Sequence, residues 1–120
     1  MEGFVKGDVV VLPFPFSDLS TSKRRPAIVV ALGEYGDVIL CQITSKPPTN
    51  RRLRRQSSSG AETIELKDKD FHEGKLKITS YVRPRKIFTA DLGLILYRAG
   101  KIKKEKIAEV EDAICKVVKE

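Results

Sequence analysis

Apolar runs separated by turn-forming residues make up most of the chain. Residues 9–12 are continuously apolar and follow the turn-forming residues 6–8 (Lys-Gly-Asp). Such a run predicts a buried strand. Pro13 and Pro15 come directly after it. Because proline has no N–H to donate to a ladder, we expect this strand to end there or to lie at an edge.

The most apolar part of the chain is a pair of runs in the segment 23–44. Residues 27–32 (Ala-Ile-Val-Val-Ala-Leu) and 38–44 (Val-Ile-Leu-Cys-Gln-Ile-Thr) are joined by a short connection at 33–37 that contains two glycines. Two β-type runs with such a connection predict a β-hairpin. Runs this rich in Val and Ile belong in the core, so polar groups at their ends are where a site could form.

Arg25 and Thr44 occupy those ends. Basic residues at 23–25 enter the first run, and Thr44 closes the second. With the turn near 33–37, an antiparallel hairpin brings positions 25 and 44 near each other at its open end. The sequence therefore predicts a guanidinium and a hydroxyl side by side at one end of a buried hairpin.

The middle of the chain carries weaker signals. Residues 63–66 and 75–79 alternate between apolar and polar, which is typical of half-buried strands. Between them, residues 67–74 are expected to form a charged turn in which Phe71 reaches the core. Residues 82–88 are expected to be extended, but not to form a central strand throughout because of Pro84.

The last segment is predicted to be one amphipathic helix that begins at residues 103–105. Its apolar positions recur at helical spacing and should pack on the sheet: Ile107, Val110, Ile114, Val117 and Val118. Five to seven short strands followed by one helix predict a mainly β fold, a small, strongly bent antiparallel barrel with a C-terminal helix. At 120 residues the chain is expected to be a single domain, 1–120.

The positive charge is concentrated in one stretch. The formal net charge is +7, and residues 46–56 hold five basic residues and no acid, which leaves 7 − 5 = +2 for the rest. A local excess of this kind favours an anionic partner such as a nucleic acid, although a solvated basic loop gives the same pattern. No apolar run reaches the length of a membrane span and no signal peptide is expected, so we predict a cytoplasmic protein with no membrane partner. Cys41 and Cys115 are then expected to be buried thiols rather than a disulfide.

Familiar catalytic signatures are missing from the sequence. The one histidine, His72, has no Cys or Ser partner near it, and with two distant cysteines it does not suggest a zinc site. The glycines do not have phosphate-loop spacing. We therefore expect no metal and no cofactor. RNA carries its own nucleophile, the 2′-hydroxyl, and a protein that cleaves it has to orient the phosphate and stabilise charge. Arg25 and Thr44 have the right side chains for this task.

The sequence resembles the MazF/PemK family of toxin endoribonucleases (mRNA interferases) from type II toxin–antitoxin systems. The matching segments cover nearly the whole chain: 6–10 (KGDVV), 25–30 (RPAIVV), 42–45 (QITS), 84–87 (PRKI) and the terminal helix. The resemblance implies an SH3-like barrel of the CcdB/PemK type and a homodimer. It also implies an antitoxin partner, expected to be acidic and partly disordered.

The resemblance further implies an activity and its site. Single-stranded RNA is expected to lie across the dimer surface and to be cleaved without metal to a 2′,3′-cyclic phosphate and a 5′-hydroxyl. Arg25 matches the catalytic arginine of the family and Thr44 its catalytic threonine. The residues expected to bind RNA are Lys23, Arg24, Ser45, Arg51, Arg52, Arg54, Arg55 and Arg85.

Two differences from the family leave the general base unidentified. Some relatives carry a glutamate shortly before the Arg-Pro pair, where this chain has residues 20–23 (Ser-Thr-Ser-Lys). Others have Arg and Asp where Ser80 and Val82 stand here. The alternatives are a non-catalytic nucleic-acid-binding module on the same barrel and a CcdB-like inhibitor of a protein target. For the single residues, Arg25 could instead be a structural clamp and Thr44 an ordinary strand threonine.

Overall fold

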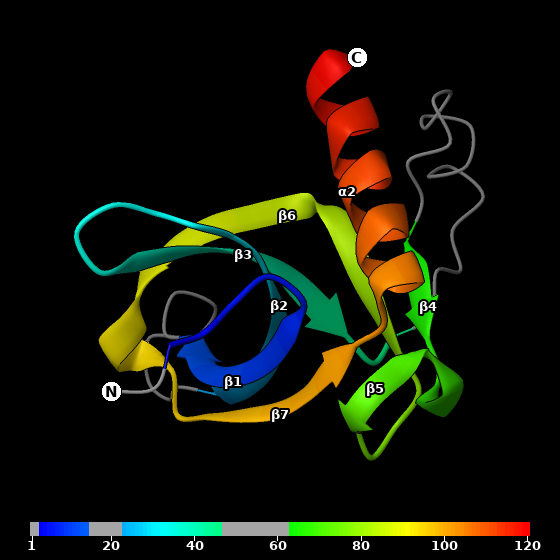
Figure 1. Cartoon of the computed structure of the whole chain (residues 1–120), viewed down its shortest axis with the longest axis horizontal. Coiled ribbons are helices and arrows are strands. Elements are labelled where there is room, and N and C mark those ends of the chain that lie inside the picture. The colour runs from blue at the N-terminus through cyan, green and yellow to red at the C-terminus, as the bar shows by residue number, and fades with distance from the viewer. Residues whose placement is uncertain (1–2, 15–22, 47–62) are drawn as a thin grey trace.

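The computed structural model describes residues 3–14, 23–46 and 63–120. Seven antiparallel strands form one sheet in the order β4-β6-β3-β2-β1-β7-β5, which curls into a nearly closed barrel with a helix standing beside it (Figure 1). The elements are β1 (Asp8–Phe14), β2 (Lys23–Leu32), β3 (Asp37–Thr44), β4 (Ile64–Leu66), η2 (Asp68–Asp70), β5 (Phe71–Gly74), β6 (Ser80–Asp91), η3 (Leu92–Leu94), β7 (Tyr97–Ile102) and α2 (Lys104–Lys119). The predicted mainly β barrel with a C-terminal helix is confirmed.

The barrel holds two clusters of buried side chains, because neighbouring residues of a strand point to opposite faces of the sheet. One cluster packs under α2 and includes Val9, Ile28, Cys41, Ile43, Phe71, Val82, Ile102 and Val110. The other lies on the opposite face and includes Val10, Leu12, Phe14, Ala27, Val29, Val38, Leu40 and Ala90. The central strands β1, β2 and β3 contribute to both clusters. They are therefore buried on both faces, and the predicted burial of their apolar runs is confirmed.

The hairpin of β2 and β3 is confirmed, and so is the expectation for the first proline. Pro13 lies within β1 and is paired with Arg24 of β2. On the other side, the pairing of β1 with β7 ends at Val11. The backbone nitrogen of Pro13, which cannot donate a hydrogen bond, thus lies where β1 has only one neighbour in the described sheet.

The expected burial of Phe71 is also confirmed, because this residue is 8% exposed in the core.

Two predictions for the second half of the chain were wrong. Residues 75–79 form no strand, and Ile78 is 64% exposed. The strand β5 lies instead at Phe71–Gly74, inside the expected turn, where Phe71 pairs with Ile102 of β7. The expectation for Pro84 is confirmed, because β6 has both β3 and β4 beside it only at residues 81 and 82, and residues 83–86 pair with neither strand. The strand β7 was not predicted, because it has no apolar run.

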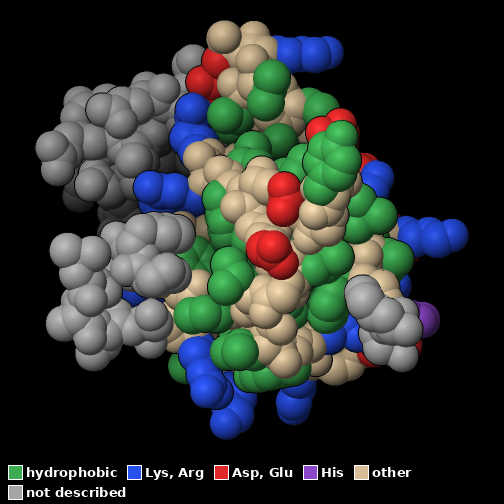
Figure 2. Space-filling view, turned by 90° about the vertical axis from the view of Figure 1, so that its left-hand side faces the viewer, with side chains coloured by type: hydrophobic (Ala, Val, Ile, Leu, Met, Phe, Trp, Pro, Cys, Tyr) green, Lys and Arg blue, Asp and Glu red, His purple; other side chains and the backbone are tan. Residues whose placement is uncertain are grey.

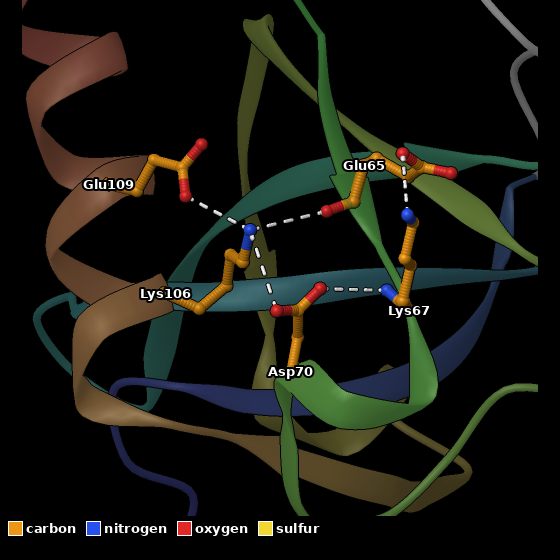
Figure 3. Close-up of polar contacts among 5 residues, drawn as sticks. All are labelled: Glu65, Lys67, Asp70, Lys106 and Glu109. Carbon is orange, nitrogen blue, oxygen red and sulfur yellow. Dashed lines mark hydrogen bonds and ion pairs between the residues drawn. The ribbon is translucent and has the colours of Figure 1, made fainter.

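Polar contacts fix the first half of α2 against the barrel (Figure 3). Lys106 Nζ lies 2.9 Å from Glu109 Oε1 and 3.7 Å from Asp70 Oδ1, and it donates to the carbonyl of Glu65 at 3.4 Å. Asp70 also accepts a hydrogen bond from the backbone N–H of Lys67 at 2.8 Å. The helix is therefore tied to η2 and β4 as well as to the apolar cluster beneath it.

One end of the barrel presents hydrophobic side chains to the outside. Figure 2 shows this face, with hydrophobic side chains across its centre and most of the visible lysines and arginines near its margins. Large exposed residues come from the end of β2 and the turn after it, from η3, and from residues 96–97 where β7 begins: Leu32, Tyr35, Leu94, Leu96 and Tyr97. Within the described residues, no helix has the length and apolar character needed to cross a membrane.

The start of β1 is fixed by a buried carboxylate. Asp8 is 0% exposed, and its Oδ2 accepts a hydrogen bond from the Val5 N–H at 2.9 Å. Its Oδ1 lies 3.6 Å from both Arg98 Nη1 and Lys101 Nζ on β7. Gly7 precedes it with φ at +97°, a conformation that favours glycine. The Gly7-Asp8 pair therefore sets both the turn into β1 and the contact of β1 with β7.

Replacing this carboxylate should weaken the whole barrel. In Asp8→Asn the charge that compensates Arg98 and Lys101 is lost, and we expect the free energy of unfolding to fall by about 2 kcal/mol. Chemical denaturation followed by circular dichroism measures this change. Asp68→Asn, which alters an exposed carboxylate, should stay within about 0.5 kcal/mol of the parent. Equal effects of the two substitutions would contradict the role assigned to Asp8.

Candidate nucleic-acid interface

Arg25 and Thr44 lie beyond the last paired residues at the open end of the β2–β3 hairpin. The pairing of β2 with β3 ends with Ala27 opposite Gln42, and each of the two candidates is two residues further along its strand. Residues two apart on a strand point to the same face. Arg25 and Thr44 therefore share the face on which Ala27 packs, at its polar end. On its other side, Arg25 pairs with Leu12 of β1.

The guanidinium of Arg25 is only partly engaged. The residue is half-buried, and its Nε is buried without a hydrogen-bond partner among the described residues. In that same part of the chain, Arg25 has no ion pair. Leaving a buried donor unpaired costs free energy that a bound anion would recover. This geometry favours an anion-binding role for Arg25 over that of a structural clamp.

The hydroxyl of Thr44 is oriented by the chain that follows it. Thr44 Oγ1 accepts a hydrogen bond from the backbone N–H of Lys46 at 3.1 Å. Because this bond uses an oxygen lone pair, the hydroxyl hydrogen can still donate. The residue is half-buried, so a ligand at the strand end can reach it.

A bulge in β6 places three further cations beside this hairpin end. Cys41 of β3 pairs with Ile87 of β6, and Ile43 pairs with Val82. One β3 residue, Gln42, therefore stands opposite the four residues 83–86 (Arg-Pro-Arg-Lys). Neighbouring strands lie about 4.8 Å apart, which puts β6 within about 10 Å of β2 across β3. Pro84 lies in this bulge, where its missing N–H breaks no pairing with β3 or β4.

Arg83 and Lys86 are the cations that the sequence reasoning missed. Arg83 is half-buried, and Lys86 is exposed. The signal was present, since three cations surround a proline within an extended segment. Only Arg85 was singled out, because the resemblance matches it to an arginine of the family. The pairing register is what shows that these residues leave the ladder together.

The thiol of Cys41 holds the bulge from inside the barrel. Cys41 is 0% exposed, and its Sγ donates to the carbonyl of Arg83 at 2.9 Å. Burial raises the pKa of this thiol to about 12, so it stays protonated and can act as the donor at neutral pH. Both cysteines are free, as predicted. Cys115 is exposed on α2, however, so the expectation that it is buried was wrong.

The other predicted RNA contacts fall into three groups. Lys23 and Arg24 are exposed at the start of β2, and Ser45 is exposed just after β3. Arg85 projects from the bulge and pairs with Glu120, Nη2 to Oε2, at 2.6 Å. The loop arginines lie outside the described residues: Arg51, Arg52, Arg54 and Arg55.

Within the described residues, no three His, Cys, Asp or Glu side chains are grouped so that they could hold a metal ion.

The sequence of residues 5–118 matches the family described as PemK-like, MazF-like toxin of type II toxin–antitoxin system. The chain belongs to this family. A search of curated protein sequences found no significant match. The matched residues span every described strand and all but the last residue of α2.

Solved structures with the same fold include MazF and proteins described as endoribonucleases. MazF from Deinococcus radiodurans superposes with a TM-score of 0.71 at 17% identity, and the alignment covers 100% of both chains. An endoribonuclease from a mycobacterial species gives a TM-score of 0.69 at 15% identity, with coverage of 99% of this chain and 94% of that one. A mycobacterial endoribonuclease in complex with its cognate antitoxin gives a TM-score of 0.70 at 15% identity. That alignment covers 98% of this chain and 96% of the other. At these identities the likeness establishes the fold.

Thiol reactivity tests the environment of Cys41. In the native protein we expect one thiol per chain, Cys115, to react quickly with a disulfide reagent, and both to react after unfolding. Burial raises the pKa of the Cys41 thiol from 9.0 to about 12 in the native protein. The protonated thiol therefore contributes fully to the free energy of unfolding below about pH 9, and this contribution is lost as the pH rises towards about 12. Rapid labelling of native Cys115→Ser at neutral pH would contradict this assignment.

Proposed function

We propose that this toxin is a metal-independent endoribonuclease that cleaves single-stranded RNA, including mRNA, at the hairpin end where Arg25 and Thr44 lie. The observation that carries the proposal is the Nε of Arg25, which is buried and has no hydrogen-bond partner among the described residues. Cations precede Arg25 on β2 and lie in the β6 bulge across β3. Cleavage also fits the fold, because structures with the same barrel are described as endoribonucleases.

The proposed reaction is a transesterification within the RNA. The 2′-oxygen attacks the adjacent phosphorus, the bond from phosphorus to the 5′-oxygen breaks, and a 2′,3′-cyclic phosphate forms. The 2′-hydroxyl loses its proton, and the departing 5′-oxygen takes one up to become a hydroxyl. Arg25 stabilises the charge of the pentacoordinate phosphorane, and Thr44 donates to a non-bridging oxygen.

The cations around the site would hold the RNA chain. Lys23 and Arg24 extend along β2 from Arg25, and the residues of the β6 bulge lie on the far side of β3. Phosphate contacts of this kind position a nucleic acid without reading its sequence. Ser45 and the loop arginines are assigned to the same surface by the resemblance to the family.

The proposed assembly is a cytoplasmic homodimer that is neutralised by an antitoxin. Among the structures with this fold are MazE–MazF complexes from Deinococcus radiodurans, which supports an antitoxin partner here. An acidic, partly disordered antitoxin would suit a basic surface, because it can fold as it covers the charges. Homodimerisation is proposed from the family resemblance.

Removing the guanidinium of Arg25 should abolish most of the activity. We expect the purified protein to cleave single-stranded RNA in the presence of EDTA, and Arg25→Ala to lower the rate by about 100-fold or more, as for the loss of one key donor to a charged transition state. Gel analysis of the fragments, with end-group mapping of the cyclic phosphate, measures both the rate and the chemistry.

A matched variant distinguishes the catalytic role of Arg25 from the mere loss of one positive charge. Lys77→Ala removes one exposed cation from a segment outside the site and should leave the rate unchanged within about twofold. Intact RNA across many sequences, with binding retained, would support the non-catalytic binding module instead. Equal cleavage by the parent and Arg25→Ala would disprove the role of this arginine.

The basic loop should set the salt dependence of binding. Each phosphate contact to a single strand contributes about 0.7 to the slope of log affinity against log salt concentration. Substituting alanine for Arg51, Arg52, Arg54 and Arg55 together should lower that slope by up to about 3. Alanine at four exposed lysines elsewhere makes the same change in charge: Lys69, Lys75, Lys77 and Lys104. If both sets lower the slope equally, the loop has no special part in binding.

A further inference from the structure

An ion pair within the chain occupies one of the proposed RNA contacts. Arg85 Nη2 and Glu120 Oε2 are 2.6 Å apart, and the two residues lie 35 positions apart in the sequence. Arg85 comes from the β6 bulge, and Glu120 caps the end of α2. The helix therefore brings a carboxylate to the edge of the cationic surface that RNA would use.

We propose that Glu120 is an internal competitor for Arg85, which an RNA phosphate must displace before Arg85 can bind it. This inference rests on the proposed function. A carboxylate and a phosphate present similar pairs of oxygens to the planar fork of an arginine, so the two ligands compete for the same donors. Glu120 thereby lowers the affinity of the site for RNA.

The exposure of the pair allows the exchange to take place. The side chains of Arg85 and Glu120 are 46% and 35% exposed. An ion pair in contact with water adds little stability and opens readily, whereas a buried pair would leave an uncompensated charge when it broke. The Arg85–Glu120 contact can therefore open without disturbing the barrel.

Other contacts keep Glu120 near Arg85. Lys6 pairs with Glu111 at 2.6 Å midway along α2, and Lys106 is bound to η2 and β4 in its first turn. The backbone N–H of Glu120 donates to the carbonyl of Val117, which continues the helical turn to its last residue. The helix thus keeps the carboxylate beside the bulge, at a high local concentration, when the pair opens.

The test compares two neutralised acids on the same helix. The probe is a short, mixed-sequence 2′-O-methyl RNA, which lacks the attacking hydroxyl and cannot be cleaved. At low ionic strength, Glu120→Gln should bind it about two- to fivefold more tightly than the parent, the range available from one exposed pair. Asp112→Asn makes the same change in charge at an exposed residue that has no ion pair within the described part of the chain, and it should bind more tightly by a smaller factor.

A second pair of variants ties the gain to Arg85. In an Arg85→Ala background, the advantage of Glu120→Gln over Asp112→Asn should shrink, because the contact of Glu120 with Arg85 is already gone. Equal gains from Glu120→Gln and Asp112→Asn in the parent, or no gain from Glu120→Gln, would overturn the inference and leave the proposed function standing. Failure of the parent to bind any RNA would defeat the proposed function itself, and the inference with it.

Discussion

The buried carboxylate of Asp8 is the constraint on which the barrel depends. A charge with no exposure to water is stable in a protein only when other groups compensate it. Here compensation comes from Arg98 and Lys101 of β7 and from the N–H of Val5. Because Asp8 is the first residue of β1, these contacts fix the strand beside β7. The strand β1 then pairs with β2, and the ladder reaches Arg25 through Leu12.

The cations of the described barrel divide into two groups by what they contact. One group stabilises the fold: Arg98 and Lys101 compensate Asp8, and Lys106 joins α2 to η2 and β4. The other group surrounds the hairpin end, where Arg25 has a buried Nε without a partner in the described residues. The cations that stabilise the fold and those that surround the hairpin end thus occupy different places in the barrel. Carboxylates offset the charge of the first group, whereas in the second only Arg85 has a carboxylate partner among the described residues.

Sequence patterns predicted the parts of the fold that depend on nearby residues. The hairpin, the burial of its strands and the terminal helix follow from apolar patterns over short ranges. The strands β5 and β7 were missed because their pairing, such as Phe71 with Ile102, joins residues far apart in the chain. Arg25 and Thr44 were chosen from their places at strand ends. The unpartnered Nε of Arg25 and the bond from Cys41 to Arg83 depend on packing, which no local pattern reveals.

The β6 bulge links the fold to the site. A proline in a central strand would normally interrupt a ladder, and here the interruption spans 83–86, opposite Gln42 alone. The displaced residues are mostly cationic, and the buried thiol of Cys41 holds their backbone through the carbonyl of Arg83. The same four residues thus accommodate the proline outside the ladder and place positive charge beside Arg25 and Thr44. The helix α2 packs on the barrel and ends at this bulge, where Glu120 contacts Arg85. The helix therefore also determines how much of the charge of the bulge is available to a ligand.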